Sequence, residues 1–213
     1  MVVWKRQHGD FEVRCSLTLG SGYLSAFEFF FSFYGLILGL SVAEVITGLI
    51  RVLKQRQRVR IGWLTPLLGL FVLLDVASFW SGAWQTMQSL EVSYGLLVVG
   101  LGIAGLYFAA ASTITPADTG EWPDFDEYFD KHKAFVATCI LATNALANVG
   151  VPLLIDASDA IRKLQDPAVW ILVGPYYALL ICLVLFRNRR VSGVLLVLLI
   201  AIYGVFAVGV PTT

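Results

Sequence analysis

Two acidic side chains stand inside apolar stretches of this sequence, where a carboxyl group is costly. Asp75 lies at about the fourteenth position of an apolar run over residues 62–84, and Glu44 lies in a run over residues 29–50. An ionisable group at the centre of a bilayer costs about 2.5–3.5 kcal/mol on insertion scales, so it normally faces a bundle interior or a wet cavity. Loss of hydration favours the neutral form of an acid. Both carboxyl groups are therefore candidates for carrying a proton or a cation.

Further polar residues share helical faces with these two acids. At about 1.5 Å of rise per residue, Asp75 and Asn144 would lie near the midplane, with Glu44 about 8 Å closer to the cytoplasm. The interpretation is a polar track across a helix bundle. The alternative is that each group is structural and joins helices by hydrogen bonds. The candidate track consists of Ser41, Glu44, Asp75, Ser78, Asn144 and Asn148.

The composition is that of a membrane protein. Of the 213 residues, 58% are hydrophobic and 14% are charged, and the mean hydropathy is +0.77. Soluble domains have roughly 45–50% apolar and about 25% charged residues. The formal net charge is zero, so no global field favours nucleic acid, and we expect none as a partner.

Six apolar runs are long enough to cross a bilayer, which takes about 20 helical residues. The sequence therefore predicts an all-α fold, a polytopic membrane helix bundle with six transmembrane helices in contact with lipid. Residues 23–213 form this domain, and residues 1–22 form an N-terminal segment. The predicted spans are residues 29–50, 62–84, 92–114, 134–155, 168–186 and 191–210.

Basic residues near helix ends predict the orientation, because they remain on the cytoplasmic side. Five lie between the first two runs, and three lie between the last two, at Arg187, Arg189 and Arg190. The opposing loops carry only Arg162 and Lys163. Both termini are therefore expected to be extracytoplasmic, and the expected location is the bacterial inner (plasma) membrane.

Two segments outside the runs have patterns of their own. Residues 11–19 alternate apolar and polar side chains, which favours a half-buried strand; the alternatives are an unordered leader or residues that precede the true start. Residues 121–133 interleave aromatic and acidic side chains, with Pro123 placed for a first helical turn. The second pattern predicts a short helix in the membrane interface before the fourth run. Its loop is interpreted as a solvated, packed connector, and the alternative is a docking surface for a basic protein partner.

Glycines inside the runs predict close helix packing. Gly35 and Gly39 form a GxxxG motif, and Gly100 and Gly102 belong to a stretch that spells the dinucleotide fingerprint by letter. That fingerprint needs a strand before it and a helix after it, whereas this stretch lies within a spanning run. We expect all four glycines to pack against helices, in this subunit or in a second copy. A kink or break is expected at Gly174-Pro175.

No catalytic or cofactor motif is present. The two histidines, His8 and His132, lie outside the apolar runs, and the three cysteines are far apart in sequence. We therefore expect no metal, no cofactor and no enzyme activity. The leading hypothesis is a small oligomeric channel or ion-coupled transporter that uses the polar track. The alternative is a non-catalytic anchor, sensor or scaffold subunit that binds a partner through its cytoplasmic loops.

Overall fold

The computed structural model describes residues 26–54, 62–87, 93–116, 122 and 124–209. Nearly all of these residues are helical, which confirms the all-α prediction. The strand expected at residues 11–19 and the turn position of Pro123 lie outside the described residues.

Six helical segments are long and apolar enough to cross a membrane, as the sequence predicts, and the chain is a multi-pass membrane protein. Their ends differ from the predicted runs by a few residues except at the fourth. The elements in order are α1 (Ala26–Lys54), α2 (Leu64–Met87), α3 (Tyr94–Thr113), α4 (Phe125–Ala145), a π-helical turn η1 (Leu146–Gly150), α5 (Val151–Ile155), α6 (Ala157–Gln165), α7 (Pro167–Leu185) and α8 (Arg189–Gly209).

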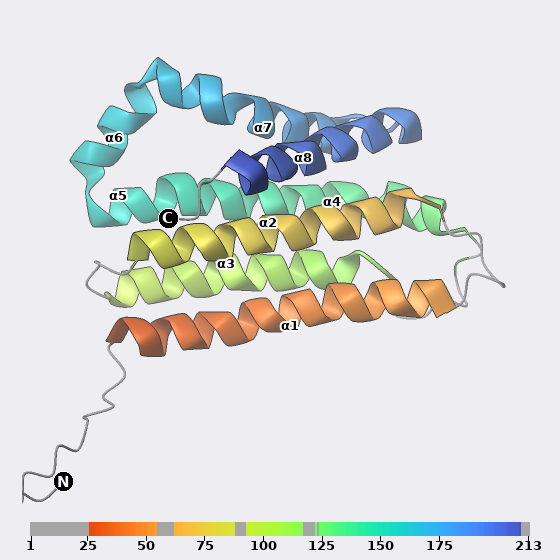
Figure 1. The fold of residues 1–213 in the computed structure, drawn as a ribbon, viewed down its shortest axis with the longest axis horizontal. Helices are drawn as coiled ribbons and strands as arrows, with labels where there is room; N and C mark the ends of the chain where they lie inside the picture. The colour runs from red at the N-terminus through yellow and green to blue at the C-terminus, as the bar shows by residue number, and fades with distance from the viewer. Residues whose placement is uncertain (1–25, 55–61, 88–92, 117–121, 123, 210–213) are drawn as a thin grey trace, which may run out of the picture.

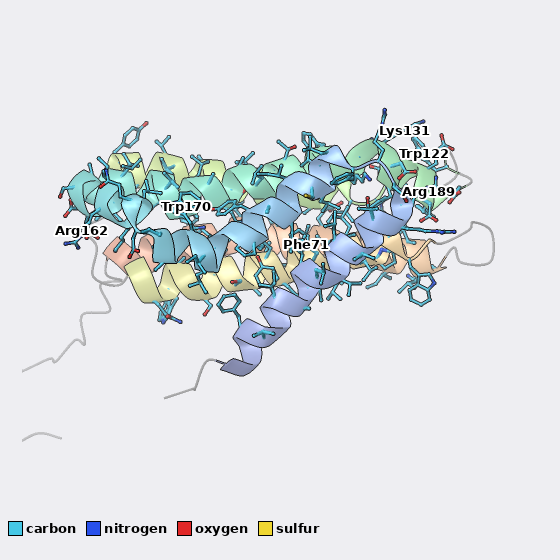
Figure 2. The ribbon with its side chains drawn as sticks, turned by 90° about the horizontal axis from the view of Figure 1, so that it is seen from above. Phe71, Trp122, Lys131, Arg162, Trp170 and Arg189 are labelled. Carbon is cyan, nitrogen blue, oxygen red and sulfur yellow. The ribbon has the colours of Figure 1, made fainter. Side chains whose placement is uncertain are left out.

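The helices form a bundle of four with a hairpin packed on it. α1 to α4 lie side by side, and α7 and α8 pack on α4 and α2 respectively as well as on each other (Figure 1). The last residue of α1, the start of α4 and the turn between α7 and α8 share one end of the molecule, which we call the Arg189 end. The other end, which carries α6, is called the α6 end. Figure 2 shows Arg189, Lys131 and Trp122 at one end, and Arg162 at the other.

The fourth span differs from the prediction. Residues 125–133 do not form a separate interfacial helix; they are the first turns of α4, which continues through η1 and α5 as one span of 31 residues. Asp124 caps the helix by accepting a hydrogen bond from the backbone N–H of Asp126 at 2.9 Å. Phe125 and Phe129 are buried. Both rings pack inside the protein, so residues 125–133 belong to the bundle and not to a separate surface helix.

α6 was not predicted from the sequence. Asp156 ends α5 with an extended backbone and caps α6 by accepting hydrogen bonds from the backbone N–H groups of Ser158 and Asp159. The Ser158 hydroxyl, followed by the Asp159 N–H, holds the pKa of the Asp156 carboxyl below its usual value. The indole N–H of Trp170 donates to the carbonyl of Leu164 at 2.7 Å, which ties α6 to the first turn of α7.

The four glycines predicted to pack divide into two pairs. A Cβ atom at Gly35 would collide with the Trp80 ring, and one at Gly100 would overlap the Tyr34 hydroxyl, so these two glycines allow close packing within the subunit. Gly39 and Gly102 face open space. α7 runs through Pro175 as one helix, so of the kink or break expected at Gly174-Pro175 the break does not occur.

Replacing Gly100 by alanine should destabilise the bundle by about 1–3 kcal/mol, because the Tyr34 ring must move from its site. Tyr34 is buried, and its hydroxyl donates to the carbonyls of Leu96 and Leu97, both at 3.4 Å. Gly105→Ala is the matched control in the same helix; a Cβ atom at Gly105 would meet nothing within 4 Å, so this change should not lower stability. Thermal unfolding in one detergent measures both variants. Equal melting temperatures would contradict the described α1–α3 contact.

The predicted orientation can be tested at two exposed described positions, Lys131 at the Arg189 end and Ser158 in α6. In a variant without native cysteines, a thiol reagent that cannot cross the membrane should label Ser158→Cys in intact cells and reach Lys131→Cys only after permeabilisation. The reverse labelling pattern would show that the orientation is opposite to the predicted one.

Candidate functional site

The Asp75 carboxyl group lies at the centre of the contact between the four-helix bundle and the hairpin. Asp75 is midway along α2 and only 2% exposed. Phe71, one turn earlier on the same helix, lies near the middle of the molecule in Figure 2. Each hydrogen-bond donor described below comes from a different helix, so five helices meet at this one side chain.

Three tyrosine hydroxyls and one amide donate to this carboxyl group. Tyr107 of α3 donates to Oδ2 at 2.8 Å, and Tyr176 of α7 donates to Oδ1 at 2.6 Å. Tyr203 of α8 also donates to Oδ1. The Asn144 Nδ2 of α4 lies 3.2 Å from Oδ1 and 3.3 Å from Oδ2. An ionised carboxylate is an acceptor with about four lone-pair sites, and these donors match that capacity.

Aromatic contacts hold the tyrosine rings in place. Phe79 packs on the Tyr107 ring at a centroid distance of 5.5 Å, and Phe71 packs on the Tyr203 ring at 6.2 Å. The Tyr203 hydroxyl lies 2.9 Å from the Tyr176 hydroxyl, so the donors from the two hairpin helices also contact each other. Ring packing therefore helps to position the Tyr107 and Tyr203 hydroxyls beside Asp75.

The polar contacts continue from the cluster to the protein surface. Asn148 is exposed; its amide donates to the backbone carbonyl of Asn144 at 2.9 Å and to the Tyr177 hydroxyl at 3.3 Å. Asn148 lies in the π-helical turn η1, and Pro175 immediately precedes the two tyrosines of α7. π-helical turns occur frequently at functional sites. A π-helical turn and a proline-containing stretch of α7 thus flank the path from Asp75 to the surface.

The structure brings together only part of the predicted polar track. Asp75, Asn144 and Asn148 belong to the hydrogen-bonded group described above. Ser78 is exposed, and the Ser41 hydroxyl donates to the Ile37 carbonyl of its own helix. Glu44 is half-buried on α1, a helix that supplies no donor to Asp75 within the described residues.

Sequence reasoning missed the tyrosines. Tyr107, Tyr176, Tyr177 and Tyr203 all lie inside apolar runs, and a phenol hydroxyl in hydrocarbon needs a hydrogen-bond partner. That requirement was visible in the sequence. The acceptor of each hydroxyl was not visible, because Tyr107, Tyr176 and Tyr203 are 32, 101 and 128 positions from Asp75.

A second polar group fastens the turn of the hairpin to α4. The Lys133 amine is buried; it donates to the Phe186 carbonyl at 2.7 Å and to the Ser192 hydroxyl at 2.6 Å. Nearby, the Arg189 guanidinium donates to Asp130 at 2.6 Å. Phe186 is the C-cap of α7. The lysine therefore supplies a hydrogen bond to a carbonyl that the helix itself leaves without a partner.

In comparisons with known proteins, no protein-family model, no curated protein and no solved structure matches the chain. Among the residues that the structure describes, no three His, Cys, Asp or Glu side chains come together in a group that could hold a metal ion. The functional argument rests on the Asp75 cluster itself.

Replacing Lys133 by methionine should destabilise the protein by about 2 kcal/mol, because the Phe186 carbonyl and the Ser192 hydroxyl lose a charged donor. Lys131→Met is the matched control. The Lys131 side chain is 57% exposed and pairs with Glu127 at 3.1 Å, and its loss should change stability by no more than about 0.5 kcal/mol. Chemical unfolding in detergent measures both. Equal effects would show that the buried contacts of Lys133 carry no net stability.

Proposed function

We propose that this membrane protein is a small ion-coupled transporter in which the Asp75 carboxyl group takes up and releases the coupling proton. The observation that carries the proposal is a buried carboxyl group midway along a spanning helix whose polar contacts continue to an exposed asparagine. Acidic residues at this depth mark ion pathways and proton relays in membrane proteins.

The donors around Asp75 suit a group that changes its charge. Three hydroxyls and an amide stabilise the ionised form. When the carboxyl takes up a proton it becomes a donor itself, and a tyrosine hydroxyl can rotate to accept from it, because a hydroxyl both donates and accepts. Protonation therefore weakens the pull of the carboxyl on at least one tyrosine. Tyr176 and Tyr203 belong to the hairpin, so the charge of Asp75 controls how firmly the hairpin is held.

The second candidate is a non-catalytic anchor, sensor or scaffold subunit. The observation that favours it is the complete set of donors, since a carboxylate that is 2% exposed and bonded to four helices can serve as a structural joint alone. In that case the exposed groups at the Arg189 end, among them Glu127 and Lys131, would face the partner.

Neither candidate requires a chemical reaction. We further propose that the protein resides in a bacterial inner membrane with both termini outside and that it assembles from several copies. Gly39 and Gly102, which face open space on α1 and α3, are the positions where the helices of a second copy could approach closely.

Asp75→Asn should abolish ion flux in liposomes while leaving assembly and fold intact, because an asparagine offers similar polar contacts but cannot exchange a proton. Flux is measured with a pH-sensitive dye trapped inside the vesicles, under a proton gradient and then with several other ions. Asp159→Asn is the matched control. Asp159 is a partly exposed acid of α6 that pairs with Lys163 at 2.8 Å, and its replacement should leave flux unchanged.

Two results would reject the transport role. Wild-type-like flux in correctly assembled Asp75→Asn would leave Asp75 as a structural joint. If the wild-type protein conducts none of the tested ions, the scaffold candidate stands.

A further inference from the structure

The hairpin of α7 and α8 is packed along only half of its length. Its buried residues all lie between the Asp75 cluster and the Arg189 end. From Tyr176 and Tyr203 toward the α6 end, no residue of these two helices whose side chain is described is buried. The buried set is Leu180, Leu183, Ser192, Leu195, Leu196 and Leu199.

The arrangement of the helices agrees with this difference in burial between the two halves of the hairpin. In Figure 1 the first turns of α7 stand away from α5, and in Figure 2 the C-terminal part of α8 runs off at an angle from the four-helix bundle. The exposed residues there include Leu172 at 70% and Val205 at 74%. The tyrosine contacts to Asp75 therefore stand at the border between a packed half and an unpacked half.

The Arg189 end is fastened by charges. Lys133 holds the C-terminus of α7 through the Phe186 carbonyl and the N-terminus of α8 through Ser192. Arg189 adds ion pairs to Asp130 at 2.6 Å and to Asp124 at 3.9 Å. These contacts tie both hairpin helices to the first turns of α4.

The α6 end has features that allow the chain to bend, whereas the other end is held by the ion pairs of Arg189. Asp156 has an extended backbone between α5 and α6, with φ −147° and ψ 98°. The Trp170–Leu164 hydrogen bond joins α6 to α7, so the two helices can move together. Pro175 has no N–H to donate within α7, which weakens that helix directly before Tyr176.

We propose that α7 and α8 form an arm that pivots at the Arg189 end and is latched at mid-length by the Tyr176 and Tyr203 hydroxyls on Asp75. Release of the latch moves the α6 end of the arm away from α4, η1 and α5, and this opens a route to Asp75 from that end. The exposed Asn148 and its partner Tyr177 stand at the mouth of the route. As a transport route this rests on the function proposed above.

Distances between spin labels test the pivot directly. In the full chain with Cys15, Cys139 and Cys182 replaced by alanine, one label pair spans the α6 end at Leu154 of α5 and Leu172 of α7. A second pair spans the Arg189 end at Phe135 of α4 and Leu185 of α7. All four side chains are exposed, at 56%, 70%, 50% and 69%.

The latch is removed by Tyr176→Phe with Tyr203→Phe, which keeps both rings and deletes only the hydroxyls. The 154–172 distance should gain a population longer by about 5 Å, the scale of a one-turn shift, while the 135–185 distance stays unchanged. Tyr94→Phe is the matched control, since Tyr94 is 82% exposed at the start of α3; it should change neither distance.

Unchanged distances in the double variant would overturn the pivot, and equal lengthening of both pairs would overturn it too, as a general loosening of the bundle. If the double variant does not fold, Tyr203→Phe alone is measured against the same criteria. The measurement needs no transported ion. If the arm moves but the wild-type protein shows no flux, the transporter proposal is rejected and the latch is kept. If the protein shows flux but the arm does not move, the latch is rejected and the transporter proposal is kept.

Discussion

A carboxyl group inside a bilayer has to obtain from the protein the hydrogen bonds that water would otherwise supply. At Asp75 this constraint is met by four donors, and no two of them come from the same helix. The association of spanning helices gains little from burying apolar surface, because lipid tails are as apolar as leucine. The polar contacts at Asp75 therefore matter more here than they would in a soluble core, and they determine where the hairpin sits on the bundle.

The other features of the molecule follow from that position. The hairpin reaches Asp75 through Tyr176 and Tyr203, and Tyr177 accepts a hydrogen bond from Asn148 of η1. At the Arg189 end, polar contacts attach it to Lys133 and to the acidic first turns of α4. Between these two levels the helices carry buried side chains, and beyond Asp75 none of their described side chains is buried. The same side chain thus serves as the joint of the fold and as the candidate site for a proton. A change at the site is for that reason also a change in how the helices are held.

A static joint and a working latch differ in one physical respect. In a joint the carboxyl keeps one charge state, and its donors are permanent. In a latch the charge changes, and the donors on the hairpin are released and regained. Thr143, one residue before Asn144, has a buried hydroxyl without a hydrogen-bond partner among the described residues, so this part of α4 is not saturated as Asp75 is. The unequal satisfaction of neighbouring groups is compatible with a region that rearranges.

The amino-acid sequence by itself determined the membrane class, the number of spans and the unusual place of Asp75, because these follow from the length of apolar runs and the cost of charge in hydrocarbon. It also picked Asn144 and Asn148 as companions by helical spacing on one run. It erred at residues 125–133, where aromatic and acidic side chains suggested a headgroup-layer helix, because burial of Phe125 and Phe129 depends on neighbours far along the chain. Only the tertiary structure decided that Tyr107, Tyr176 and Tyr203 meet at Asp75 while Glu44 and Ser78 do not. Local spacing shows which face of one helix is polar, but the partner of that face depends on how five helices are arranged around one another in space.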